Sequence, residues 1–180
     1  MFLILPEQLN DKAAINTLLD DAFGAGRHSK VSYTFRQDGP AIADLSFIAR
    51  SGNRLVGSIR FWPLIVGDTQ VPSLLLGPLG VVPEMHNYGI GRGLICRGHM
   101  MAFELGYKLV FLVGEEKYYG RLGYQSAQPY GVTMPLEDPT RLLVHELQDD
   151  ALDCVSGSLK AGDCLRLGGL SAGISYQAIL

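Results

Sequence analysis

Hydrophobic positions near the start of the chain change from a continuous run to a helical period. Residues 2–5 are a short apolar run that predicts a strand. Asn10 or Asp11 can cap a helix after it, and Gly24 can end that helix. Between these residues, one helix face carries Ile15, Leu18, Leu19, Ala22 and Phe23. Residues 25–42 are polar and aromatic and predict a poorer second helix or a loop.

Longer β-rich runs follow. Residues 46–50 and 55–66 are separated by a turn composition, which predicts a hairpin. A third run spans 71–82 and is interrupted by Gly77-Pro78. A regular central strand does not accept this pair without a bulge or a bend, so we expect an irregular third strand.

The period becomes helical again after this third run. One stripe consists of Ile90, Leu94, Gly98, Met101 and Leu105, widened by Ile95 and Ala102. Gly106 occupies the position of a C-terminal cap. Residues 108–113 predict a short buried strand, followed by a short helix or turn. Runs at 131–134 and 142–147 are expected to complete the sheet.

This order of elements predicts the fold class. It indicates an α/β or α+β sandwich, with a mixed central sheet of about six to seven strands flanked by helices. A chain of 180 residues is within the range of one domain. We expect that domain over residues 1–150, with a Gly-, Ser- and Ala-rich extension over 151–180 packed on it.

Composition and charge narrow the classes of function. The chain is 47% hydrophobic and 18% charged, which is typical of a globular protein. Its net charge is -3 and its Lys and Arg residues are scattered, so we expect no nucleic-acid partner. The opening apolar run stops at Pro6 and Glu7, too early for a signal peptide or a spanning helix. We therefore expect a cytoplasmic protein with no membrane role.

Cysteine and histidine positions give no metal-site pattern. The cysteines lack Cys-x-x-Cys spacing and are expected to be reduced thiols: Cys96, Cys154 and Cys164. The histidines form no ligand pair at helical spacing: His28, His86, His99 and His145. We predict that the protein holds no metal.

The segment that carries most chemical information joins the third run to the next helix. It reads His86-Asn87-Tyr88-Gly89-Ile90-Gly91. Such a loop aims backbone N–H groups and the positive end of a helix dipole at one point, which favours an anion. Gly89 and Gly91 allow a phosphate to approach closely, and Arg92 can add a charged contact.

Known nucleotide and hydrolase motifs do not fit. The Gly-Lys-Ser/Thr triplet of a nucleotide-hydrolysing loop is missing, and Gly93 falls one place early for the dinucleotide fingerprint G-x-G-x-x-G. Residues 169–173 match G-x-S-x-G of the α/β-hydrolases. That fold needs an acid and a histidine after the serine, and residues 174–180 contain neither, so we interpret the match as chance.

The loop resembles the acyl-CoA loop of the GNAT superfamily of N-acetyltransferases, Gln/Arg-x-x-Gly-x-Gly/Ala after Val-x-Pro. His86 departs from that pattern. A second stretch, Tyr118-Tyr119-Gly120-Arg121-Leu122-Gly123-Tyr124, resembles the Phe/Tyr-Tyr-x-x-x-Gly-Phe signature of the same superfamily. The likeness is strongest to its bacterial YhbS-like subgroup. It covers about residues 3–147, with the specific motifs in 76–124.

The resemblance implies acetyl-CoA as a cosubstrate. The pantetheine arm would pair with the interrupted strand, and a backbone N–H near Val81 would face the thioester carbonyl. Tyr119 matches the tyrosine that protonates the departing thiolate, a role that suits a phenol of ordinary pKa. The residues implied in binding are Leu79, Val81, Val82, His86, Asn87, Tyr88, Gly89, Ile90, Gly91, Arg92, Gly93 and Tyr119.

The general base and the acceptor stay open. Glu84 stands beside the loop, and Glu115 and Glu116 follow the fifth strand, so each is a candidate base. A water chain or an already neutral amine would make all of them dispensable. Residues that could line an acceptor pocket are Arg27, His28, Tyr33 and Tyr130.

The function implied is an N-acetyltransferase that moves an acetyl group from acetyl-CoA to a primary amine by direct transfer in a ternary complex. A small molecule or a peptide would supply the amine, and a homodimer is compatible with the resemblance. The alternative is a non-catalytic acyl-CoA sensor on the same fold. Tyr119 argues against that alternative, because a pure binding module needs no proton donor there.

Overall fold

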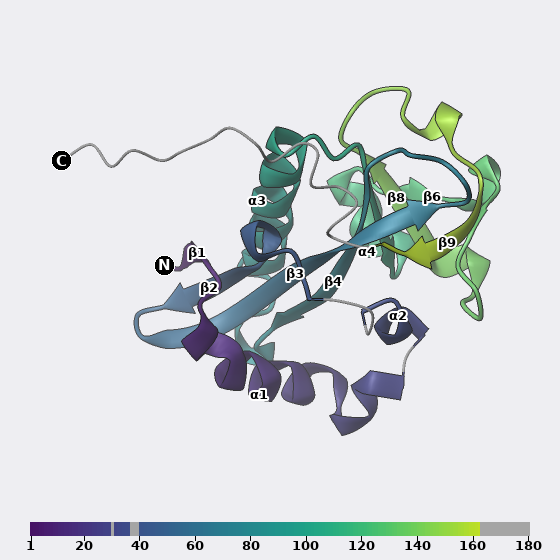
Figure 1. The fold of residues 1–180 in the computed structure, drawn as a ribbon. Coiled ribbons are helices and arrows are strands. Elements are labelled where there is room, and N and C mark those ends of the chain that lie inside the picture. The colour runs from purple at the N-terminus through teal and green to yellow at the C-terminus, as the bar shows by residue number, and fades with distance from the viewer. Residues whose placement is uncertain (30, 37–39, 163–180) are drawn as a thin grey trace.

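The computed structural model describes residues 1–29, 31–36 and 40–162 and shows a twisted mixed sheet with helices on both faces (Figure 1). The helices are α1 (Lys12–Phe23), α2 (Val31–Thr34), α3 (Ile90–Glu104) and α4 (Glu116–Tyr119). The strands are β1 (Leu3–Pro6), β2 (Phe47–Ser51), β3 (Arg54–Val66), β4 (Ser73–Val81), β5 (Leu109–Val113), β6 (Gln125–Ser126), β7 (Val132–Thr133), β8 (Leu142–Glu146) and β9 (Gly157–Ala161).

The strand order confirms the predicted fold class. The main path runs β1-β2-β3-β4-β5-β8-β6, and β4 with β5 is the parallel pair within it. β9 pairs with the end of β3 and with β7. The described residues therefore form nine strands, more than the six or seven expected. β6 has only two residues and β9 begins at a glycine, so neither has a hydrophobic pattern that predicts a strand.

α1 and α3 pack on opposite faces of β2 and β3, as Figure 1 shows. Ile48 and Leu55 pack with α1, whereas their chain neighbours Phe47 and Val56 pack with α3. This alternation follows from the two-residue period of a strand. The predicted end of α1 is confirmed, since Gly24 is its C-cap, whereas the C-cap of α3 is Leu105, one residue before the predicted Gly106.

The interruption of β4 opens the sheet. β4 and β5 pair only where Ser73–Leu75 lies beside 109–111, although both strands continue beyond this point. The Gly77-Pro78 bond is cis, and the β3–β4 register shifts between Ile59 and Phe61. The indole Nε1 of Trp62 donates to the Gly77 carbonyl at 2.7 Å, which fixes the bend. The predicted irregularity is confirmed, and it leaves one edge of β4 over residues 76–81 facing away from β5.

α1 packs very close to the face of this part of β4. A Cβ added at Gly80 would stand 2.5 Å from Leu18 Cδ2 and 2.9 Å from Leu19 Cδ2. Only glycine permits this approach without moving the leucines. The contact places Phe23, the last residue of α1, beside the gap between β4 and β5.

Candidate active site

Two pockets meet at the gap between β4 and β5. The loop pocket, about 540 Å³, lies between β4, the segment 85–92 and the end of α1. The arginine pocket, about 400 Å³, lies between α2, β4, β5 and the segment that contains Glu137 and Arg141. Phe23, Leu79 and Tyr119 line both pockets. A molecule in one pocket can therefore meet a molecule in the other at these residues.

The start of α3 forms the polar end of the loop pocket. Asn87 and Gly89 have left-handed backbones, with φ 69° and 80°, and they turn the chain sharply into the helix. No described side chain caps this helix. The first N–H groups of a helix have no partner within it and carry the positive end of the dipole. This end of the pocket is consequently suited to an anion.

Gly91 keeps the loop pocket open. A Cβ added there would lie 3.0 Å from the Tyr118 hydroxyl and 3.9 Å from side-chain atoms of Leu79 and Val81. A larger side chain would project into the space between these groups. The position therefore requires glycine for space, whereas Gly89 requires it for its left-handed backbone.

Most predicted binding residues come together here. Those lining the loop pocket are Leu79, Val81, His86, Asn87, Gly89, Ile90, Gly91, Arg92 and Tyr119. Val82, Tyr88 and Gly93 lie outside it, since Val82 packs with the α1 cluster, Tyr88 is exposed and Gly93 faces Ile4. Sequence reasoning missed the lining residues Asp21, Ala22, Phe23, Gly80, Pro83, Met85 and Tyr118.

Tyr119 and Tyr118 occupy different positions. Tyr119 is partly buried between the two pockets, and burial raises its pKa to about 12. Tyr118 is 51% exposed and lines only the loop pocket, with its ring edge-on to Tyr119 at 4.8 Å. The Tyr119 phenol therefore stays protonated well above neutral pH, and its acidity is weaker than the ordinary phenol assumed from sequence.

A histidine and a tyrosine stand behind Tyr119. The Tyr124 ring contacts Tyr119 edge-on at 5.8 Å, and the Tyr124 hydroxyl is 2.7 Å from His99 Nε2. His99 stacks on His145, with ring centroids 4.4 Å apart. Burial, with a smaller contribution from His145, lowers the pKa of His99 to about 3. His99 is thus a neutral hydrogen-bond partner that fixes Tyr124.

The predicted carboxylates do not line either pocket. Glu84 is exposed and pairs with Arg54; a backbone hydrogen bond and this partner lower its pKa. Glu115 is 77% exposed and lies 3.5 Å from Arg141, and Glu116 is also outside both pockets. Glu137, which sequence reasoning missed, lines the arginine pocket with only 14% of its side chain exposed. No periodic pattern marks Glu137, because it lies in an irregular segment.

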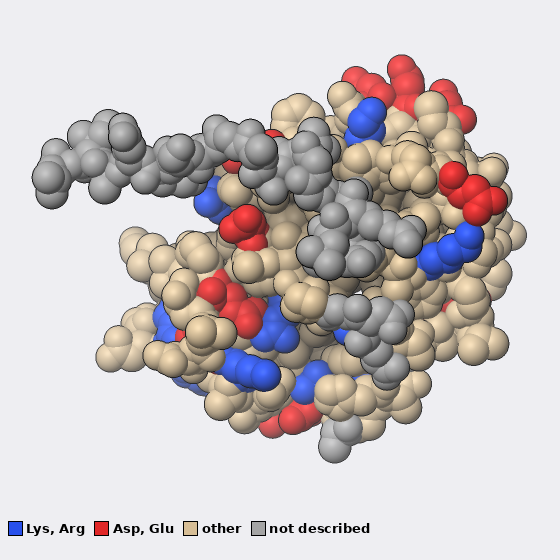
Figure 2. Space-filling model, viewed as in Figure 1, with Lys and Arg blue, Asp and Glu red and all other residues tan. Residues whose placement is uncertain are grey.

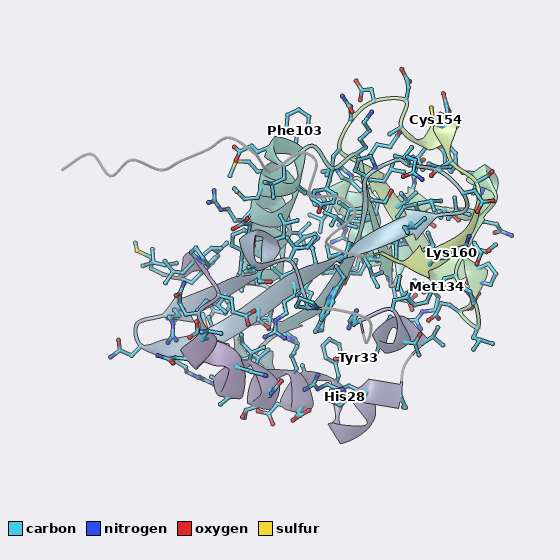
Figure 3. All side chains as sticks on the ribbon, viewed as in Figure 1. His28, Tyr33, Phe103, Met134, Cys154 and Lys160 are labelled. Carbon is cyan, nitrogen blue, oxygen red and sulfur yellow. The ribbon has the colours of Figure 1, made fainter. Side chains whose placement is uncertain are left out.

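Of the predicted acceptor residues, Tyr33 lines the arginine pocket. Arg27 is buried and engaged, since it donates to Asp20 at 2.7 Å and to the Tyr33 hydroxyl at 2.8 Å. His28 packs edge-on against Tyr33 at 5.0 Å, and Figure 3 shows the two rings together near the end of α1. Tyr130 packs against a core cluster and does not line the arginine pocket.

Arg36 is the cation that sequence reasoning did not select. Its guanidinium lies over the Tyr33 ring, 4.6 Å from the centroid, and Nη2 is 2.7 Å from the position of a Cβ added at Gly77. Burial lowers its pKa to about 10. The residue falls in the polar segment 25–42, where nothing in the spacing distinguishes it from Arg27.

The described residues contain no candidate for a metal site or for a membrane-spanning helix. Among residues 1–29, 31–36 and 40–162, no group of three or more His, Cys, Asp or Glu could hold a metal ion. No helix in the described part of the chain is both long and apolar enough to cross a membrane. On the face shown in Figure 2, acidic and basic side chains occur in small interspersed groups. Cys164 and residues 169–173 lie outside the described residues.

Comparison with known proteins places the chain among acetyltransferases. No model of a known protein family matches it. It is 27% identical to the uncharacterized N-acetyltransferase YhbS of Escherichia coli K12, over 82% of this chain and 88% of that protein. It is 30% identical to the uncharacterized N-acetyltransferase YjhQ of the same organism, over 64% and 65%.

Solved structures of GNAT acetyltransferases have the same fold as this chain. The crystal structure of E. coli YhbS in complex with CoA matches with a TM-score of 0.79 and 26% identity, over 89% of both chains. A GNAT acetyltransferase from Brucella melitensis, in complex with acetyl-CoA, shares the fold with a TM-score of 0.69 and 21% identity, over 91% and 97%. The homology to YhbS and YjhQ and this shared fold agree with the two sequence motifs. The chain is homologous to the N-acetyltransferases YhbS and YjhQ of E. coli and has the GNAT fold.

Proposed function

We propose that the protein transfers an acetyl group from acetyl-CoA directly to a primary amine, with CoA in the loop pocket and the amine in the arginine pocket. The observation that carries the proposal is the meeting of the two pockets at Leu79 and Tyr119. Two substrates held there would touch without a covalent enzyme intermediate. The CoA complex of the related YhbS supports the choice of cosubstrate.

The residues present fit the parts of CoA. The uncapped start of α3, with Arg92 beside it, suits the pyrophosphate. The free edge of β4 over residues 76–81 offers backbone groups to the amides of the pantetheine arm, as an added strand would. An N–H near Val81 would then donate to the thioester carbonyl and stabilise the negative charge that develops on its oxygen.

The transfer needs two proton movements. The amine nitrogen forms a bond to the thioester carbon, the C–S bond breaks, and the electron pair leaves with sulfur. Tyr119 donates a hydrogen bond to that sulfur and supplies the proton as the bond breaks. The pKa of about 12 keeps this donor protonated until then. Glu137 accepts the proton that the ammonium must lose, because it is the carboxylate that lines the arginine pocket.

A calorimetric titration with acetyl-CoA, CoA and ATP tests the cosubstrate. We expect micromolar binding of acetyl-CoA and CoA and none of ATP. Gly91→Trp fills the loop pocket and should abolish binding. Cys96→Trp, on the exposed side of the same helix, places the same bulk away from the pocket and should bind normally. Failure of the wild-type protein to bind either CoA form would refute the proposal.

A non-catalytic acyl-CoA sensor is the alternative. Such a protein would need the loop pocket, but not a second charged pocket that opens onto the same tyrosine. Turnover separates the two functions. Release of CoA that depends on an added amine identifies an enzyme, whereas tight binding with no turnover on any amine identifies a sensor.

A further inference from the structure

The two arginines of the arginine pocket differ in their partners. Arg141 is 3.5 Å from Glu115 and 3.9 Å from Glu137, so two carboxylates balance its charge. Arg36 has no carboxylate within 4.0 Å among the described residues. Its Nε is buried without a hydrogen-bond partner in the described part of the chain. Among the described residues, Arg36 is therefore the arginine of this pocket that faces no carboxylate and has a buried N–H without an acceptor.

Such an arrangement is unfavourable in the free protein. A buried charged group without a counter-ion is destabilising, and a buried N–H without an acceptor adds to the cost. The lowered pKa of Arg36 reflects the same desolvation. A bound anion would remove both penalties, and the planar guanidinium can hold two oxygen atoms side by side. Functional sites are where structures keep such uncompensated groups.

Arg36 also lies close to the reaction centre. Its Nη2 meets β4 at Gly77, and Leu79, only two residues further along the strand, already belongs to both pockets. Two residues of a strand span about 7 Å. An anion held by Arg36 is thus separated by a short distance from an amine near Tyr119, and Glu137 is available in the same pocket for the amine itself.

We propose that the acceptor is a small amino acid, a primary amine with a carboxylate a few bonds away, in which Arg36 binds the carboxylate and Glu137 receives the ammonium. This inference rests on the proposed function. A pocket of about 400 Å³ has room for a small amino acid. A polyamine or an aminoglycoside would bring several positive charges against Arg36 and Arg141, which disfavours both.

Matched acceptors test the inference on the wild-type protein. The rate of CoA release is measured with saturating acetyl-CoA and glycine, β-alanine or γ-aminobutyrate, each against its carboxamide. Spermidine, kanamycin and aminomethylphosphonate complete the panel. We expect at least one amino acid to exceed its carboxamide by tenfold or more in kcat/KM. Equal rates on acid and amide, or a preference for spermidine, kanamycin or the phosphonate, would overturn the assignment.

Variants assign the carboxylate to Arg36. Arg36→Met should lower kcat/KM for the amino acid by about 100-fold and leave its carboxamide within threefold, while Arg36→Lys retains part of the difference. Arg54→Met, which removes a cation outside both pockets, is the control. If Arg36→Met does not fold, the Arg36→Lys variant and the ratio of wild-type rates on acid and amide still test whether Arg36 binds the carboxylate.

Calorimetry distinguishes failure of the amino-acid inference from failure of the proposed acetyltransferase function. Acetyl-CoA should bind Arg36→Met as it binds the wild-type protein, because Arg36 does not line the loop pocket. The amino acid should bind the wild-type CoA complex and not the Met variant. If acetyl-CoA binds but only non-acidic amines react, the amino-acid inference fails and the proposed function stands. If acetyl-CoA does not bind, the proposed function fails first.

Discussion

The two pockets of this protein are built from different material. The loop pocket is lined mainly by one run of chain, residues 79–92, with its glycine-containing turn into α3. The arginine pocket instead brings together the charged side chains of Arg36, Glu137 and Arg141 from separate segments. Backbone recognition needs a fixed chain path and therefore leaves a glycine pattern in the sequence. Recognition by side chains needs only that a few of them meet in space. We therefore expect the loop pocket to bind the cosubstrate mainly through backbone and the arginine pocket to select the acceptor through side chains.

The sharpest test of this contrast compares adding a side chain with removing one in the loop pocket. We expect Gly91→Trp to weaken acetyl-CoA binding by at least 1,000-fold, because the indole would occupy the pocket. His86→Ala should change the Kd by about threefold or less, since its described polar contact is one exposed bond, Nε2 to the Val81 carbonyl at 3.1 Å. Calorimetry measures both. A large loss in His86→Ala would mean that side chains, rather than backbone, hold the cosubstrate.

Tyr119 belongs to both pockets, so its loss should affect the chemistry more than either binding step. Tyr119→Phe is expected to lower kcat about 100-fold and leave the Kd for acetyl-CoA within twofold. Tyr118→Phe is the matched control and should lower kcat less than threefold. Because the pKa of Tyr119 is raised to about 12, deprotonation of this residue should not reduce the rate below about pH 10. An alkaline limb that appears near pH 8 and persists in Tyr119→Phe belongs to another group.

Glu137 tests the side-chain pocket in the same way. Glu137→Gln keeps the shape and removes the charge, and we expect kcat/KM to fall about 30-fold at pH 7. Part of the loss should be recovered at higher pH, where the amine is neutral without help. A pH-rate profile of both proteins measures this. An unchanged profile would exclude Glu137 as the proton acceptor and leave a water chain.

The same contrast explains what the sequence could predict. Hydrophobic period and glycine position identified α1, the β2–β3 hairpin, the break at Gly77-Pro78 and α3, because each depends on neighbours in the chain. The loop and Tyr119 were predicted for that reason, through motifs of short range. Arg36 and Glu137 were not, because about 100 residues separate them and only the folded sheet brings them to one pocket.

Glu84 and Glu115 were predicted as bases because they lie close in sequence to the site, but closeness in sequence did not place their side chains in a pocket. Both lie next to elements that line the site, yet both side chains are exposed and pair with arginines, Glu84 with Arg54 and Glu115 with Arg141. β9 was missed for a third reason. Its Gly157–Ala161 segment has little hydrophobic pattern and is a strand because β3 extends far enough to pair with it at Leu64–Val66.

His99, which lies behind Tyr119, should have a smaller effect, on the free energy of unfolding. His99 has a folded pKa of about 3, below its usual value, so the unfolded chain binds a proton first as the pH falls. Stability should therefore decrease from about pH 6.5 downward, by about 2 kcal/mol between pH 7 and pH 5. His99→Gln keeps a polar partner for Tyr124 and should remove this decrease. Urea unfolding of both proteins at the two pH values measures it, and parallel pH dependence would assign the effect to other groups.

The smallest effects are expected at the carboxylates outside the pockets. Glu84→Gln and Glu115→Gln should each leave kcat/KM within twofold at pH 7, because the Glu84 partner is Arg54 and the Glu115 partner is Arg141 at 3.5 Å, and neither carboxylate lines a pocket. Exposed ion pairs contribute little. Steady-state rates on the same acceptor as for Glu137→Gln provide the comparison. A loss at Glu84 that equals the loss at Glu137 would place the general base beside the loop pocket. Cosubstrate binding and amine activation would then not belong to separate pockets. A loss at Glu115 alone would instead act through Arg141, and KM rather than kcat should change.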